Sequence, residues 1–142
     1  MFIKILVAFL FAACNIEASQ NTDASSHIDL GNSHAKKGNY AEALSSLNLA
    51  ISKDPNQARC YKLRGHVYYA MGDYTPALQD LDRVVALSPD SANAYVDRAI
   101  IYSKLGRHGL ALADIEKALE IKPDSHFAQE VRKKILENAS EK

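Results

Sequence analysis

The chain has 142 residues, of which 17 are basic and 17 acidic, so its formal net charge is zero. A protein that binds nucleic acid normally presents a basic face to the phosphates, and a balanced charge gives no indication of such a face. We therefore predict no nucleic-acid partner. Cleavage or acylation at Cys14 would leave Cys60 as the single free thiol, so no intramolecular disulfide is expected.

The first 18 residues differ from the rest of the chain. Lys4 precedes the unbroken apolar run Ile5–Ala13, and the sequence turns polar after Cys14. A helix that crosses a bilayer needs about 20 apolar residues, so this run is too short. The pattern predicts a secretory signal peptide over residues 1–18, followed by a polar linker over 19–23. The alternative is a buried apolar helix packed on the first repeat.

Two processing sites remain open. Cleavage after Ala18 would release a soluble exported protein into a bacterial periplasm or the medium. Residues 11–14, Phe-Ala-Ala-Cys, resemble a bacterial lipobox, in which Cys14 would become a lipidated first residue. In that case Asn15 favours an outer-membrane lipoprotein, and the lipid on Cys14 would be its membrane contact. Both alternatives predict export.

A period of 34 residues follows. In each copy it is marked by a proline and a glycine: Pro55, Pro89 and Pro123, and Gly38, Gly72 and Gly106. A fixed period of this length is typical of one supersecondary unit repeated in tandem. We predict three repeats, over residues 24–57, 58–91 and 92–125.

Each repeat reads as a helical hairpin. The first helix covers about 14 positions and ends at the glycine, which tolerates a left-handed conformation. The second helix starts after Asn39 or Asp73, which we expect to cap it, and ends before the proline. Arg107 holds the cap position of the third repeat, so that helix start is expected to be the weakest. Residues 126–142 continue an amphipathic pattern and predict a C-terminal cap helix and tail.

The aligned copies share residue types at fixed positions, which in the second copy are Tyr61, Gly65, Tyr68, Ala77 and Pro89. This pattern resembles the tetratricopeptide repeat over 102 of the 142 residues. The departures are histidine for an aromatic residue at 27, 34 and 108, arginine for leucine at 64 and 98, and aliphatic residues at position 24 of each copy. The resemblance implies an all-α, right-handed superhelical α-solenoid of three helix-turn-helix repeats with a capping helix.

Positions 7 and 23 of the repeat change together. They hold arginine and aspartate in two copies but leucine and serine in the first: Arg64 and Asp80, Arg98 and Asp114, Leu30 and Ser46. We predict an ion pair between the two helices of one repeat. If the pair is exposed to solvent, it would contribute only about 0–1 kcal/mol and would set register more than stability.

No catalytic constellation is present in the sequence. There is no Ser-His-Asp arrangement, no glycine-rich phosphate loop and no isolated carboxylate pair. His27, His34 and His108 occupy aromatic positions of the repeat and are interpreted as packing residues. A metal shared by His27 and His34, which lie seven residues apart, is the alternative, although no cysteine lies near them. We predict neither enzymatic activity nor a metal or other cofactor.

The resemblance also implies a concave surface lined by the first helix of each repeat. The predicted partner-binding residues are Asn32, Lys36, Arg59, Lys62, His66, Tyr69, Asn93, Asp97, Ile100 and Lys104, and Leu63 and Val96 also occupy inward positions. Tyr69 is the type of aromatic anchor that dominates many protein interfaces. Basic residues outnumber Asp97, which favours an acidic partner. The alternative is an ordinary polar helix face.

Co-chaperones of this family hold the C-terminal carboxylate of heat-shock chaperones with a clamp of lysine, asparagine and arginine. The corresponding residues are Ile28, Asn32, Leu63, Asn93 and Asp97. Only Asn32 agrees, and Asp97 is acidic where the clamp needs a cation. We predict that this clamp is absent.

The sequence therefore predicts an exported protein-interaction module, an adaptor or assembly scaffold that binds a peptide or helix of a partner protein. A self-associating structural component of the cell envelope is the alternative, because the ends of three repeats can stack on another copy. A cofactor-dependent enzyme is a more distant alternative.

Overall fold

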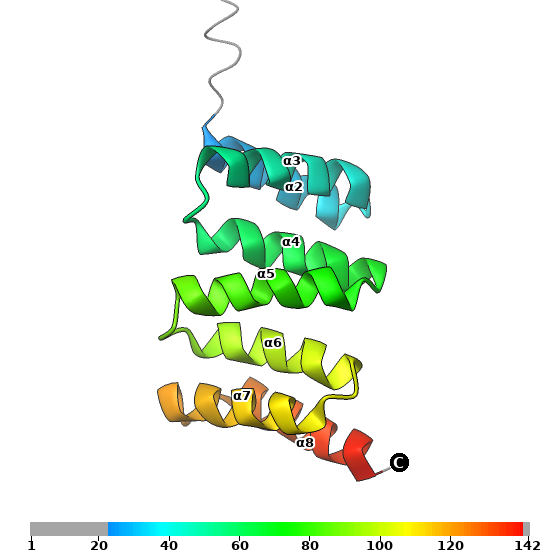
Figure 1. Cartoon of the computed structure of the whole chain (residues 1–142), viewed down its shortest axis with the longest axis vertical. Coiled ribbons are helices and arrows are strands. Elements are labelled where there is room, and N and C mark those ends of the chain that lie inside the picture. Colours follow the sequence, from blue (N-terminus) through cyan, green and yellow to red (C-terminus); the bar gives the residue numbers. More distant parts are fainter. Residues whose placement is uncertain (1–22, 141–142) are drawn as a thin grey trace, which may run out of the picture.

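The computed structural model describes residues 23–140, which form seven α-helices and no strand. The helices are α2 (Ala24–Lys36), α3 (Tyr40–Lys53), α4 (Ala58–Met71), α5 (Tyr74–Leu87), α6 (Ala92–Lys104), α7 (His108–Ile121) and α8 (His126–Ser140). They stack in one column in chain order (Figure 1), which confirms the all-α solenoid. The predicted signal peptide and Cys14 lie outside the described residues. Within residues 23–140, no helix has the length and apolar character needed to cross a membrane.

The helices pair as α2–α3, α4–α5 and α6–α7, and a glycine closes each hairpin. Gly38, Gly72 and Gly106 have φ angles of 78°, 83° and 73°, in the left-handed region that favours glycine. In the second hairpin, the backbone N–H of Asp73 donates to the carbonyl of Tyr68 at 2.9 Å, which satisfies an end group of α4. The prediction that glycine ends the first helix of each hairpin is confirmed.

The expected side-chain caps of the second helices are wrong. The side chains of Asn39, Asp73 and Arg107 make no capping hydrogen bond to α3, α5 and α7. At these three residues ψ lies between 60° and 74°, below the extended values at which a capping side chain usually meets the first turn. Arg107 therefore does not differ from Asn39 and Asp73 in this respect. Asp23 does cap α2, because its carboxylate accepts from the N–H of Ser26 at 2.9 Å.

Small residues allow the two helices of a hairpin to approach closely. Ala43, Ala77 and Ala111 have no exposed surface. A Cβ added at Gly65 would lie 3.4 Å from the carbonyl oxygen of Ala77, whereas one at Gly31 would lie 2.7 Å from Leu47 Cγ. The first hairpin is thus the more tightly packed at this position.

The core continues across the boundaries between repeats. Ile28 and Ala50 of the first repeat form one buried cluster with Cys60 of the second. Leu81 and Val84 of the second repeat pack in the same way with residues of α6. Burial raises the pKa of the Cys60 thiol, which keeps it protonated and unreactive. Stability in such a stack is close to a sum of neighbouring interfaces.

The predicted ion pairs are present, and each is a bidentate contact. Arg64 donates from Nε and Nη2 to the two carboxylate oxygens of Asp80 at 2.8 and 2.7 Å. Arg98 does the same with Asp114 at 2.7 and 2.8 Å. Hydrogen bonding to Asp114 raises the pKa of Arg98, so its guanidinium remains charged.

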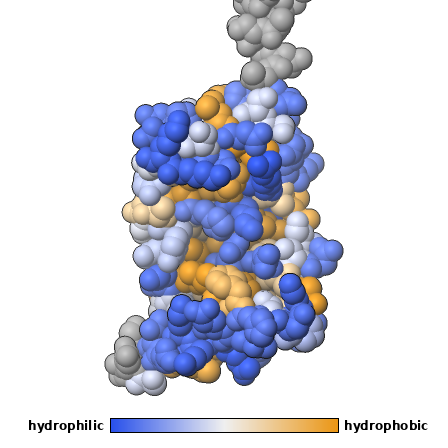
Figure 2. Space-filling view, turned by 180° about the vertical axis from the view of Figure 1, so that it is seen from behind, coloured by the Kyte–Doolittle hydropathy of each residue, from blue (hydrophilic) through white to orange (hydrophobic). Residues whose placement is uncertain are grey.

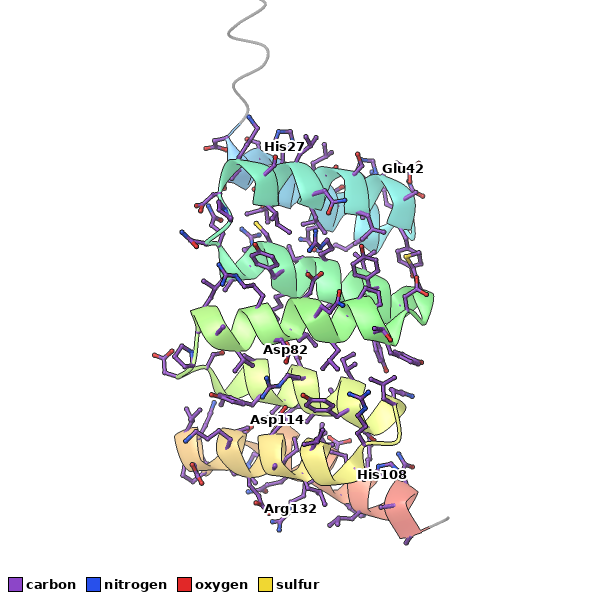
Figure 3. The ribbon with its side chains drawn as sticks, in the orientation of Figure 1. His27, Glu42, Asp82, His108, Asp114 and Arg132 are labelled. Carbon is purple, nitrogen blue, oxygen red and sulfur yellow. The ribbon has the colours of Figure 1, made fainter. Side chains whose placement is uncertain are left out.

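The pairs differ from the expectation in their exposure. Asp80 and Asp114 are only 4% and 7% exposed, because each carboxylate lies between the helices of its hairpin. Arg98 also donates to Asp82 of the preceding repeat at 2.9 Å. Asp82 and Asp114 lie on either side of α6 (Figure 3), so Arg98 joins two repeats. The stability contribution expected for a solvent-exposed ion pair therefore does not apply to these two pairs.

Helix α8 repeats the geometry of a first helix and is the last element among the described residues. Gln129 donates to the carbonyl of Pro123 at 3.4 Å, as Tyr95 does to Pro89 at 3.0 Å one repeat earlier. Its buried side chains are Ala128, Val131 and Ile135. Lys133, however, occupies the position that holds glycine or alanine in the three hairpins. A long side chain at this position differs from the small residues that allow close helix contact in the three hairpins.

Candidate functional site

A groove follows the first helices of the hairpins and consists of three adjoining pockets. The N-terminal pocket lies between α2 and α4, the central pocket between α4 and α6, and the C-terminal pocket between α6 and α8. His66 lines the first two, and Tyr69 and Ile100 line the last two, so the groove is continuous. The face opposite the view of Figure 1 shows apolar surface between polar margins (Figure 2).

The N-terminal pocket has a volume of about 260 Å³. Asn32 and Lys36 reach it from α2, and Leu63, His66 and Val67 from α4. Lys36 is exposed and makes no ion pair with another described residue. This end of the groove can supply an amide, a cation and an apolar wall.

The central pocket is built around Asp97, whose side chain is 16% exposed. Asp97 Oδ2 lies 3.5 Å from Lys62 Nζ and 3.3 Å from His66 Nε2. These distances allow electrostatic attraction, but neither contact has the geometry of a hydrogen bond, and Oδ2 has no hydrogen-bond donor. Asp97 Oδ2 is therefore a buried acceptor whose hydrogen-bonding capacity is unsatisfied.

The C-terminal pocket has a volume of about 300 Å³. Its apolar lining is Tyr69, Ile100, Phe127, Val131 and Ile135. Its polar lining is Ser103, Lys104, Lys134 and Asn138. Helix α8 is therefore more than a cap, because it forms one wall of the groove.

Sequence reasoning missed the contribution of α8. We expected the groove to end at Lys104, because residues 126–142 were interpreted as a C-terminal cap helix and tail. Extending the 34-residue period to residue 126 would have placed Val131 and Lys134 at positions 6 and 9, which hold the groove residues Leu63 and His66 in the second repeat. The positions of these residues in the 34-residue repeat are the sequence feature that could have predicted the contribution of α8.

The structure places most of the predicted residues together. Seven of the ten predicted partner-binding residues line the three pockets: Asn32, Lys36, His66, Tyr69, Asp97, Ile100 and Lys104. Lys62 borders the central pocket through Asp97. Arg59 and Asn93 line none of the three, and Arg59 instead pairs with exposed Asp29 at 3.0 Å.

Val96 was assigned to the groove by its position in the repeat, and that assignment is wrong. Its side chain is 1% exposed and belongs to the core cluster with Ala99 and Ile115. Within residues 23–140, no group of three or more histidine, cysteine, aspartate or glutamate residues is arranged to hold a metal ion. The groove offers apolar surface, hydrogen-bonding groups and cations.

A family model described as tetratricopeptide repeat matches residues 30–96 and 81–135. No curated protein matches the chain. Among solved structures, the first TPR of Spaghetti (RPAP3) bound to the HSP90 peptide SRMEEVD is 25% identical with a TM-score of 0.78, and the match covers 85% of this chain and 96% of that one.

Two further structures are similar. The second TPR domain of human RPAP3, in complex with the HSP70 peptide SGPTIEEVD, is 27% identical with a TM-score of 0.74 and coverage of 79% and 93%. The Arabidopsis OM64 TPR domain is 22% identical with a TM-score of 0.75 and coverage of 80% and 94%, which shows the shared fold alone.

Proposed function

Because the chain belongs to the tetratricopeptide repeat family, we propose that it is a protein-interaction module whose groove binds an extended segment or a helix of another protein. The observation that carries this proposal is the continuity of the groove, in which Tyr69 and Ile100 separate two pockets and line both. A bound segment can place successive side chains in these pockets.

The groove can supply affinity through a few anchors. Each apolar side chain buried there stabilises the complex by about 25 cal/mol per Å² of surface removed from water. Tyr69 is half-buried and presents a rigid ring, which loses little conformational entropy on binding. The polar groups of the groove, Asp97 beside Tyr69 and Asn32 in the N-terminal pocket, fix the register of the partner.

The partner differs from the chaperone tails bound by the two RPAP3 domains. Those peptides end in Glu-Glu-Val-Asp. Of the five clamp positions, only Asn32 keeps the required residue type, and Asp97 lies in the groove with a donor-free carboxylate oxygen. A second carboxylate placed there would be repelled.

The cellular setting rests on residues 1–18. We propose an exported adaptor or assembly scaffold, in the periplasm or outside the cell, with an outer-membrane lipoprotein anchored at Cys14 as the alternative. Intact mass of the mature protein separates the two, because cleavage after Ala18 removes Cys14 and lipidation adds acyl chains to it.

Crosslinking from the groove tests the proposed function. A photoreactive residue replaces Tyr69 in the full chain expressed in its native cell, and a matched variant carries it at exposed Lys117, which lines none of the pockets. We expect one protein captured from position 69 and not from 117, and a lower affinity of that purified protein for Tyr69→Ala. Equal capture at both positions would contradict the proposal.

Self-association is favoured by a different observation. Leu30 and Leu49, each 48% exposed, lie in the first repeat, and Leu30 occupies the position at which Arg64 and Arg98 contact a preceding repeat. A second copy could cover this end. Size-exclusion chromatography over a dilution series would then show a concentration-dependent oligomer that Leu30→Arg abolishes.

A further inference from the structure

This inference rests on the proposed function and specifies the ligand of one part of the groove. The geometry points to the C-terminal pocket as a recognition site for a bulky apolar side chain that stands next to a carboxylate in the partner's segment.

The shape fits one large apolar side chain. Val131 and Ile135 are 8% and 2% exposed and are packed into the core of the third repeat, so this part of the pocket is rigid. Phe127 is 54% exposed and provides an apolar surface that no described residue covers. A volume of about 300 Å³ is at the lower end of ligand pockets, which typically measure about 300–1,000 Å³.

The charge fits an acidic group beside that side chain. The two charged residues that line the pocket, Lys104 and Lys134, are both basic. Lys134 already pairs with Glu130 at 2.9 Å. Lys104 is exposed at the end of α6 and makes no ion pair with another described residue. Lys104 is therefore the cation available to a ligand carboxylate.

The neighbouring pocket sets the direction of the ligand. Asp97 lies seven residues, about two turns, before Lys104 on the same face of α6, and its carboxylate would repel an acidic group but attract an N–H or O–H donor. Seven residues of an α-helix span about 10 Å along its axis, and an extended chain advances about 3.3 Å per residue. The ligand therefore carries its hydrogen-bond donor about three residues from the apolar and acidic pair.

This site is separate from the clamp of the family's co-chaperones. None of the five clamp positions lines the C-terminal pocket, and five of its lining residues come from α8: Phe127, Val131, Lys134, Ile135 and Asn138. The pocket forms because α8 packs beside α6 in the position that the first helix of a next repeat would take.

Synthetic hexapeptides test the inference. The ¹⁵N-labelled full chain is titrated with acetylated, amidated Ser-Gly-Leu-Glu-Gly-Ser and with versions in which glutamine or lysine replaces the glutamate, or serine replaces the leucine. An ion pair of about 1 kcal/mol corresponds to about fivefold in affinity. We expect affinity to fall about fivefold from glutamate to glutamine, further for lysine, and at least tenfold when leucine is lost.

Two variants locate the contact. Lys104→Gln should abolish the preference for glutamate over glutamine while leaving leucine-dependent binding intact. Lys133→Gln, a matched change on an exposed part of α8 outside the pocket, should preserve that preference. Amide shifts should concentrate at Ile100, Lys104 and Val131.

The outcomes separate this inference from the proposed function. Equal binding of the glutamate and lysine peptides, or shifts confined to the N-terminal pocket, would overturn the ligand assignment and leave the groove proposal standing. Failure of the leucine–glutamate peptide to bind at millimolar concentration would also overturn the assignment. Crosslinking from position 69 tests the proposed function independently of these peptides.

Discussion

Replacement of Arg98 by leucine, the residue that the first repeat carries at this position, should destabilise the fold strongly. Arg98 makes two hydrogen bonds to Asp114, at 2.7 and 2.8 Å, and one to Asp82, at 2.9 Å. Asp114 is 7% exposed, so Arg98→Leu leaves its carboxylate buried without its guanidinium. Removal of one partner from a buried pair typically costs about 3–5 kcal/mol.

The opposite single change should cost less. Asp114→Ser leaves Arg98, which still reaches Asp82 and lies over the rings of Tyr95 and Tyr102 at 5.8 and 5.7 Å. Loss of two charge-assisted hydrogen bonds while the cation keeps other partners is expected to cost about 1–2 kcal/mol. The double variant reproduces the leucine and serine of the first repeat and should also cost about 2 kcal/mol, because no buried charge is left unpaired.

Urea denaturation followed by circular dichroism at 222 nm measures these free energies for the four proteins of the cycle. Strong non-additivity is the expected result, with the double variant more stable than Arg98→Leu alone. If Arg98→Leu lowered the free energy of unfolding by less than about 1 kcal/mol, the ion pair would contribute no more than an exposed pair does. That result would contradict the inference that burial of Asp114 makes the loss of Arg98 costly. Additive effects of the two changes would refute it as well.

Three further changes test the packing. Ala77→Leu should destabilise by about 1–3 kcal/mol through overpacking, and a neutral denaturation midpoint would contradict the repeat alignment. Gly31→Ala should destabilise because its Cβ would meet Leu47 at 2.7 Å, whereas Gly65→Ala should be neutral or stabilising by up to about 1 kcal/mol; equal effects would argue against these distances. His108→Tyr should raise stability by about 0.5–2 kcal/mol, since both imidazole nitrogens are buried without hydrogen-bond partners, and a lower melting temperature would count against this.

The sequence alone predicted part of the course of the groove. Position within the repeat placed Tyr69, Asp97 and Ile100 on one face, because residues at a fixed helical register point in one direction. The same reasoning failed for Val96, since small differences in helix packing decide which residues at the edge of a face are covered. It also could not show that α8 closes the C-terminal pocket.

By itself, the 34-residue period determined the fold, because each hairpin can bury its apolar face only against the next one. Alignment of the repeats also predicted the pairing of Arg64 with Asp80, because the residues at these two positions change together between repeats. Only the tertiary structure decided that this pair is buried and that Lys104 makes no ion pair with the other residues of 23–140. Burial and unpaired charge depend on which side chains of different helices meet in space, and a linear pattern specifies the face of a helix but not what covers it.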